Sequence, residues 1–109
     1  MKRFALDNMV RGWFVGNFDP SAFRTNDFEV GVKRFKKGDL EQAHYHKVAT
    51  EITLVVSGKV KMGNQILVSG DIICISPNEV CDFYALEDAT IVVVKTKSIV
   101  GDKYAKLDR

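Results

Sequence analysis

Short apolar segments, each ended by turn-forming residues, fill most of the chain between residues 52 and 94. The interruptions are Ser57-Gly58, Gly63-Asn64, Gly70-Asp71 and Ser76-Pro77-Asn78. Glycine and asparagine favour tight turns, and proline cannot continue an interior strand. Helices are disfavoured because glycine and β-branched residues break each candidate 3.6-residue pattern. Short strands at close, even spacing predict an antiparallel sandwich or barrel, so the expected fold class is all-β.

Two other segments predict strands that differ in burial. Phe28, Val30 and Val32 alternate with polar or small residues, which predicts that the Phe28 face of this strand is buried. The same parity reaches Arg34, which could hold an anionic substrate group, although a strand end in water is the favoured interpretation. Residues 90–94 form a continuous apolar run, which predicts a strand buried on both faces.

The 109 residues are enough for one domain with one core. Residues 1–25 are expected to form an N-terminal arm or edge strand, and residues 100–109 a surface tail. The net charge is +2 and the cations are scattered, so no nucleic-acid partner is expected. No stretch approaches the roughly 20 apolar residues that span a bilayer, and no signal peptide is recognisable, so we expect a cytoplasmic protein with no membrane partner.

Both histidines of the chain lie two positions apart, at His44 and His46, and Glu51 follows closely. Side chains two positions apart on a strand point to the same face, so both imidazoles can bind one metal ion. Glu51 has the opposite parity, unless Lys47 to Thr50 form a turn or bulge that delivers it from the neighbouring strand. Two nitrogens and one carboxylate then form an open metal triad. The alternative is a chance grouping on a solvated strand.

The full stretch has the spacing G-x5-H-x-H-x4-E-x6-G, from Gly38 to Gly58. It resembles the first conserved motif of the cupin superfamily at every defining position. The segment "GDIICISPNEVCDFY" is similar to the second motif of that family in Gly70, Asp71 and the apolar run. It departs in that its proline lies one residue from the usual place and the final histidine is missing. Cys81 occupies the histidine's position.

The resemblance implies a single-domain cupin, an antiparallel double-stranded β-helix or jelly roll that is often dimeric. It also implies that His44, His46 and Glu51 bind one divalent transition metal, with iron, zinc, manganese and nickel not distinguished. The fourth ligand could be Cys81, which favours zinc or iron, or Asp82, which suits iron(II) or manganese. Alternatively neither residue binds, and Cys81 is a core residue.

Parity predicts which other side chains line the cavity. Gln42 shares the face of the two histidines, Thr53 follows Glu51, and Phe83 shares the parity of Cys81. We therefore expect Gln42, Thr53 and Phe83 to contact a small-molecule ligand.

Other side chains are expected away from the cavity. Cys74, within an isoleucine run, is expected in the core as a free thiol. The outward row Ile52, Leu54 and Val56 needs a cover, either a second copy of the chain or the N-terminal arm with Trp13 and Phe14.

Two functions fit these features best. The first is a metal-dependent enzyme of isomerase, lyase or dioxygenase type that acts on a small polar metabolite. No catalytic acid or base is assigned, because Tyr84 and Glu79 are only nearby candidates. The second is a non-catalytic cupin that binds or senses a small ligand. A metal-free barrel with relic ligands is a third interpretation that the intact histidine spacing disfavours.

Overall fold

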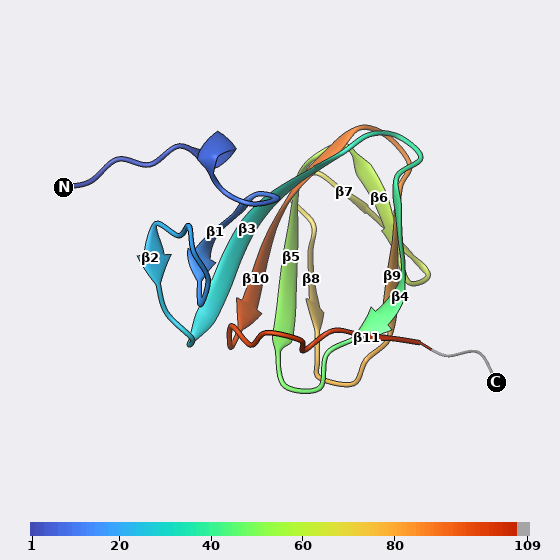
Figure 1. The fold of residues 1–109 in the computed structure, drawn as a ribbon. Coiled ribbons are helices and arrows are strands. Elements are labelled where there is room, and N and C mark those ends of the chain that lie inside the picture. Colours follow the sequence, from blue (N-terminus) through green and yellow to red (C-terminus); the bar gives the residue numbers. More distant parts are fainter. Residues whose placement is uncertain (107–109) are drawn as a thin grey trace.

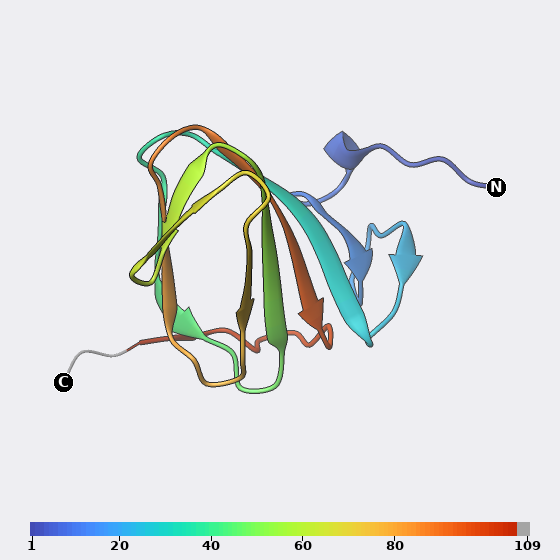
Figure 2. The same ribbon diagram turned by 180° about the vertical axis from the view of Figure 1, so that it is seen from behind.

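The computed structural model describes residues 1–106, in which eleven strands and one 3₁₀ turn form two facing sheets. The two sheets converge at one end of the molecule and are bridged by loops at the other (Figures 1 and 2). In chain order the elements are η1 (Leu6–Asn8), β1 (Trp13–Gly16), β2 (Phe23–Arg24), β3 (Phe28–Phe35), β4 (Leu40–Tyr45), β5 (Thr50–Ser57), β6 (Lys59–Met62), β7 (Gln65–Val68), β8 (Ile72–Ile75), β9 (Cys81–Ala85), β10 (Ala89–Thr96) and β11 (Tyr104–Ala105). The all-β class predicted from the strand and turn pattern is confirmed.

The first sheet has the order β2-β1-β3-β10-β5-β8, and the second has the order β11-β4-β9-β6-β7. Apart from the short parallel pair β1–β2, neighbouring strands are antiparallel. No helix among the described residues is long and apolar enough to cross a bilayer.

The core fills the space between the sheets with side chains from alternate positions of both. In β5 and β10 these are Val55, Ile91 and Val93, and they meet Val60 and Ala85 of the second sheet. All five are at most 5% exposed. Each large aliphatic side chain buried in this way contributes on the order of 2 kcal/mol to folding. The site described below lies beside this core.

Strand β3 has the opposite facing to the one predicted. Gly31 is its buried position, whereas Phe28 is 38% exposed and Val30 and Val32 are half-buried on the outer face. The reason is Trp13 of the neighbouring strand β1. Its ring lies directly over Gly31, and a Cβ atom on that glycine would lie 2.7 Å from Trp13 Cε3. The inward face of β3 is therefore built around a glycine that admits a tryptophan.

The outer face of the first sheet is apolar. Ile52 and Leu54 point outward as predicted. On the neighbouring strand β10 they pair with Val94 and Val92, respectively. These two valines are half-exposed, so the prediction that β10 is buried on both faces is wrong within one chain. Cys74 pairs with Ile52 on the same surface and is exposed, which contradicts its expected place in the core. Alternation explains this, because Ile73 and Ile75 take the inward positions of β8.

The two ends of the chain lie at opposite sheet edges. Within residues 1–25, β1 and β2 add to the edge of the first sheet beyond β3. The C-terminal segment runs from β10 across the bridged end of the molecule and pairs with β4 as β11 (Figure 1). Residues 100–109 were expected to form a surface tail, but Asp102 within them is only 8% exposed. Residues 107–109 lie outside the described part of the chain.

Candidate metal centre

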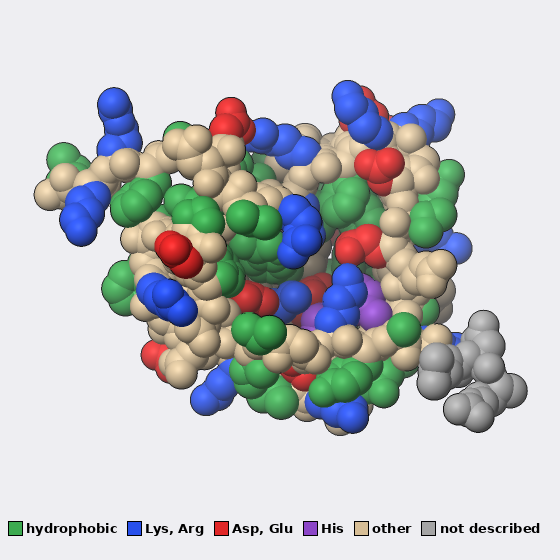
Figure 3. Space-filling model, in the orientation of Figure 1, with side chains coloured by type: hydrophobic (Ala, Val, Ile, Leu, Met, Phe, Trp, Pro, Cys, Tyr) green, Lys and Arg blue, Asp and Glu red, His purple; other side chains and the backbone are tan. Residues whose placement is uncertain are grey.

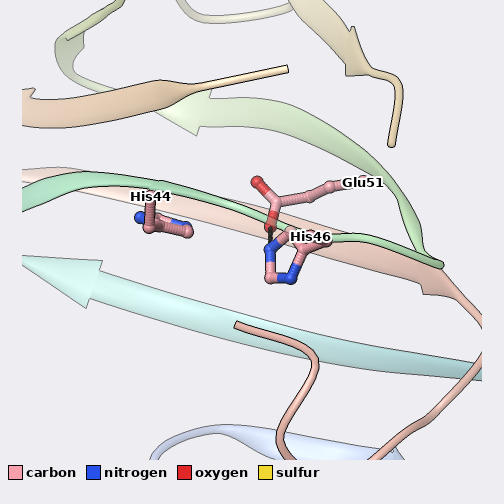
Figure 4. A group of neighbouring side chains, drawn as sticks. All are labelled: His44, His46 and Glu51. Carbon is pink, nitrogen blue, oxygen red and sulfur yellow. Dashed lines mark ion pairs between the residues drawn. The ribbon is translucent and has the colours of Figure 1, made fainter. Parts of the chain in front are cut away.

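His44, His46 and Glu51 come together where β4 turns into β5. One ligand atom from each side chain lies within 4.8 Å of the others. Strand β4 ends at Tyr45 and β5 begins at Thr50, so the intervening turn delivers Glu51 to the face of the histidines as predicted. Figure 4 shows His46 and Glu51 pointing toward each other with His44 beside them. The three groups form a cluster that could hold one metal ion.

Backbone carbonyls orient both imidazole rings in the same way. His44 Nδ1 lies 2.9 Å from the carbonyl oxygen of Gln42, and His46 Nδ1 contacts the carbonyl oxygen of Asp102. A carbonyl oxygen can only accept, so each Nδ1 must carry the proton that it donates. In the neutral rings both Nε2 atoms then keep their lone pairs. Metal-binding histidines are commonly fixed by this kind of contact.

His46 Nε2 is buried and has no aligned hydrogen-bond partner among the described residues. Its nearest charged neighbour is Glu51, whose Oε1 lies 3.4 Å away. A buried ring nitrogen left without a partner is unfavourable unless a proton or a metal occupies it. The donor set of two imidazoles and a carboxylate therefore fits a divalent transition metal.

The Glu51 carboxylate and the Asp102 carbonyl raise the pKa of His46 above its usual value, while burial opposes this. Burial alone would raise the pKa of Glu51, but His46 and Lys95 hold it below its usual value. Without a metal, these shifts favour a proton on His46 beside an ionised Glu51. A metal that binds at His46 Nε2 competes with a proton for the same atom.

Thr53 continues the inward face of β5 beyond Glu51. Its side chain is fully buried, and Oγ1 has no hydrogen-bond partner among the described residues. Thr53, His44 and Glu51 all line an inner cavity of about 60 Å³. Since one ordered water needs roughly 10–15 Å³ by the same kind of measure, the cavity can hold an ion with a few small ligand atoms.

The loop between the ligands is held by Asp102, a residue that sequence reasoning missed. Its carboxylate accepts backbone N–H groups of Lys47 at 2.9 Å, Val48 at 3.2 Å and Ala49 at 2.9 Å. Burial alone would raise its pKa, but these three N–H groups hold it below the usual value. One residue of the C-terminal segment thus fixes both the His46 ring and the loop that leads to Glu51.

Comparison with known proteins shows a likeness in structure. No protein-family model matches the sequence, and no curated protein matches it. An uncharacterized conserved protein with a double-stranded β-helix domain from Klebsiella pneumoniae is 25% identical, with a TM-score of 0.72 over 97% of this chain and 93% of that one. A sugar phosphate isomerase from the cupin superfamily of Silicibacter pomeroyi is also 25% identical, with a TM-score of 0.61 over 65% of this chain and 51% of that one. In its fold, this chain is a small cupin.

KdgF from Halomonas sp. has the same fold as the cupin described here, at 22% identity and a TM-score of 0.64 over 70% of this chain and 74% of that one. The predicted double-stranded β-helix is thereby confirmed. The departure of this cupin from the second motif falls at Cys81, which pairs with His44 across the sheet.

Cys81 lines the cavity of the cupin but does not belong to the three-residue cluster. Burial, with nearby Asp82 and Glu51, raises the pKa of its thiol to about 11, and the thiol donates to the carbonyl oxygen of Asp82. Asp82 also lines the cavity, and its carboxylate accepts the N–H of Gly63 at 3.0 Å. That Cys81 or Asp82 is the fourth metal ligand remains a prediction.

The parity argument failed for Gln42. Its side chain is exposed, and Glu41 lines the cavity in its place. The cause is an irregularity in β4, whose pairing with β9 shifts between Glu41 and His44. An extra residue of this kind in a strand reverses which side chains face inward.

Phe83 lies where parity places it. It is 3% exposed, lines the cavity and packs against Phe35 with 4.3 Å between ring centroids. Arg34 is exposed and does not line the cavity, whereas its neighbour Lys33 does. The reversed facing of β3 explains this exchange, so the cation at the site was missed by one position.

Proposed function

We propose that this cupin binds one divalent transition metal through His44, His46 and Glu51 and acts on a small polar metabolite there. The observation that carries the proposal is the buried, unpartnered Nε2 of His46 beside Glu51, with both Nδ1 atoms already bound to carbonyls. Such a metal would supply Lewis-acid or redox chemistry of the isomerase, lyase or dioxygenase type.

A site for chemistry needs positions that the protein does not fill. Three protein ligands leave such positions, whereas purely structural sites normally use four. The cavity beside the cluster combines the apolar wall of Phe83 with the free hydroxyl of Thr53. This mixture of an apolar wall and a few convergent polar groups is typical of small-molecule sites. Similarity to a sugar phosphate isomerase supports the isomerase type among the three.

The alternative is a cupin that binds or senses the metabolite without converting it. Neither nearby candidate for an acid or base favours an enzyme. Tyr84 is 41% exposed, and Glu79 accepts the N–H of Ser76 in a loop. Turnover of a panel of small sugars and acids by the metal-loaded protein separates the two functions. Tight binding with no conversion of any member would favour the binding protein.

The metal itself is tested by measuring metal content after purification. We expect about one metal per chain in the wild type and a loss of most of it in His44→Ala. Gln42→Ala is the matched control, because its exposed side chain lies two positions from His44. Equal metal content in all three proteins would exclude the site.

We further propose that the protein is a cytoplasmic homodimer formed through the outer face of the first sheet. Ile72, at 65% exposure, extends the apolar surface of Ile52 and Leu54. The N-terminal arm lines a groove together with Val32 of β3. A second copy of the same face would cover this surface symmetrically. Leu54→Lys should then give a monomer in sedimentation, whereas Ile66→Lys, on the other sheet, should not. A wild-type monomer refutes the dimer.

A further inference from the structure

The inner cavity opens into a larger groove of about 630 Å³. Both are lined by the same five residues, which therefore mark the mouth between them: Trp13, Lys33, Glu41, Lys95 and Lys103. Figure 3 shows lysine and arginine side chains around a hollow in which histidine is visible. A ligand that reaches the cluster from this groove must pass the three lysines.

Two of the three lysines already have acidic partners. Lys95 Nζ lies 3.6 Å from Glu29 Oε1, and Lys103 Nζ lies 3.6 Å from Glu41 Oε2. Lys33 has no carboxylate within 4.0 Å in the described part of the chain. Instead, its ammonium group lies 5.3 Å from the ring centroid of Trp13. Lys33 is thus the cation at the mouth whose charge no acid of the described chain directly neutralises.

The surroundings of Lys33 disfavour its charge. Burial lowers its pKa, Lys103, Lys95 and Arg11 lower it further, and Glu41 opposes them. An anion placed against Lys33 would favour its charged state and offset the repulsion between the cations. The Lys33 side chain is therefore suited to bind an anionic group of a ligand.

The charges that line the inner cavity also favour an anionic ligand. Three lysines face three carboxylates there, and with neutral histidines these charges cancel: Lys33, Lys95, Lys103, Glu41, Glu51 and Asp82. A divalent metal on the proposed ligands leaves an excess of two positive charges. A partly buried site is most stable when a ligand neutralises such an excess.

We propose that the ligand of this site is a small organic anion whose acidic group binds Lys33 at the mouth while its polar remainder reaches the metal cluster. This inference rests on the proposed function and adds to it the charge of the substrate. Carboxylates and phosphate monoesters share the required chemistry. An ammonium group binds either as a point charge.

The test compares charged probes with uncharged partners of similar shape. Lactate is paired with lactamide and glycerol 3-phosphate with glycerol, and each is titrated calorimetrically into zinc-loaded protein. We expect the charged member of at least one pair to bind about tenfold more tightly, as a charge-assisted contact implies. The pair that shows the preference identifies the carboxylate or phosphate source.

Variants assign the preference to Lys33. Lys33→Gln should lose most of it, and Lys33→Arg, which keeps the charge, should retain it. Lys61→Gln is the matched control, because Lys61 is an exposed lysine outside the cavity and the groove. Metal content should be the same in all four proteins.

Equal affinity within both pairs, or no binding of any probe, overturns the inference. So does a Lys33→Gln variant that keeps the full preference. Failure of the proposed function is distinguishable, since it appears as a wild type without metal. The same titrations on that metal-free protein still ask whether Lys33 selects anions.

Discussion

Removing the Asp102 carboxylate tests whether the C-terminal segment holds the ligand loop. Asp102→Ala leaves three backbone N–H groups without their acceptor. Ala49 is buried at 2% exposure, so its unpaired N–H should cost about 1–3 kcal/mol. Lys47 and Val48 are exposed, so water can replace their bonds at about 0.5–1 kcal/mol each. The expected loss is about 2–5 kcal/mol, a large part of the stability of a small domain.

Urea unfolding of the metal-free protein measures this loss. With a slope of about 2 kcal/mol per molar urea, the midpoint should fall by about 1–2.5 M. Asp102→Asn keeps one oxygen acceptor, so its urea midpoint should lie between those of the wild type and Asp102→Ala. Asp71→Ala is the matched control, because its carboxylate accepts a single N–H, from Val68 at 2.9 Å, in an exposed turn.

Asp102→Ala also tests the proposed metal centre. Asp102→Ala keeps the backbone carbonyl that contacts His46 but releases the loop between His46 and Glu51, and losing support around the ligands typically weakens metal affinity about 10- to 100-fold. A competition titration with a chelator measures the affinity. If Asp102→Ala unfolds like Asp71→Ala and binds metal like the wild type, the clamp has no role and the reasoning is refuted.

Three further predictions follow from the pKa directions and the packing. The lowered pKa of Asp102 stabilises the fold above the unfolded value of about 4 and less as pH falls below it, so Asp102→Asn should flatten the acid limb of urea stability against pH. The raised pKa of His46 stabilises the metal-free protein below about pH 6.5, and this is lost as pH rises through the folded value. Metal affinity, measured by chelator competition, should show the opposite trend and rise with pH up to that value. Gly31→Ala places a methyl group 2.7 Å from the Trp13 ring and should lower unfolding free energy by about 1–3 kcal/mol; an unchanged value would contradict the tight contact.

The grouping of His44, His46 and Glu51 was predictable because the three residues are local in sequence. His44, His46 and Glu51 fall within eight positions, so strand parity and one turn suffice to bring them together. The facing of β3 was not predictable from the same rule. Its residues Val30 and Val32 are apolar because the outer face of the sheet is apolar too, and the glycine between them makes room for Trp13.

Other features depend on contacts that no local pattern reports. Gln42 was misplaced because an irregularity in β4 has no clear residue signature. Asp102 was missed because its partners in the loop lie 53 to 55 positions away, in a segment that reads as a polar tail. A cation at the site was considered at Arg34, one position from Lys33. The error came from the reversed facing of β3 and not from the type of side chain expected.

The distance along the chain between the ligands and their clamp has a consequence for biosynthesis. A ribosome that has released residues 44 to 51 has made every protein ligand of the proposed centre, yet not Asp102, which orients His46 and secures the loop. The nascent chain therefore carries the donor atoms without their final geometry. The proposed centre can therefore reach its final geometry only after the C-terminal segment has crossed the bridged end of the molecule.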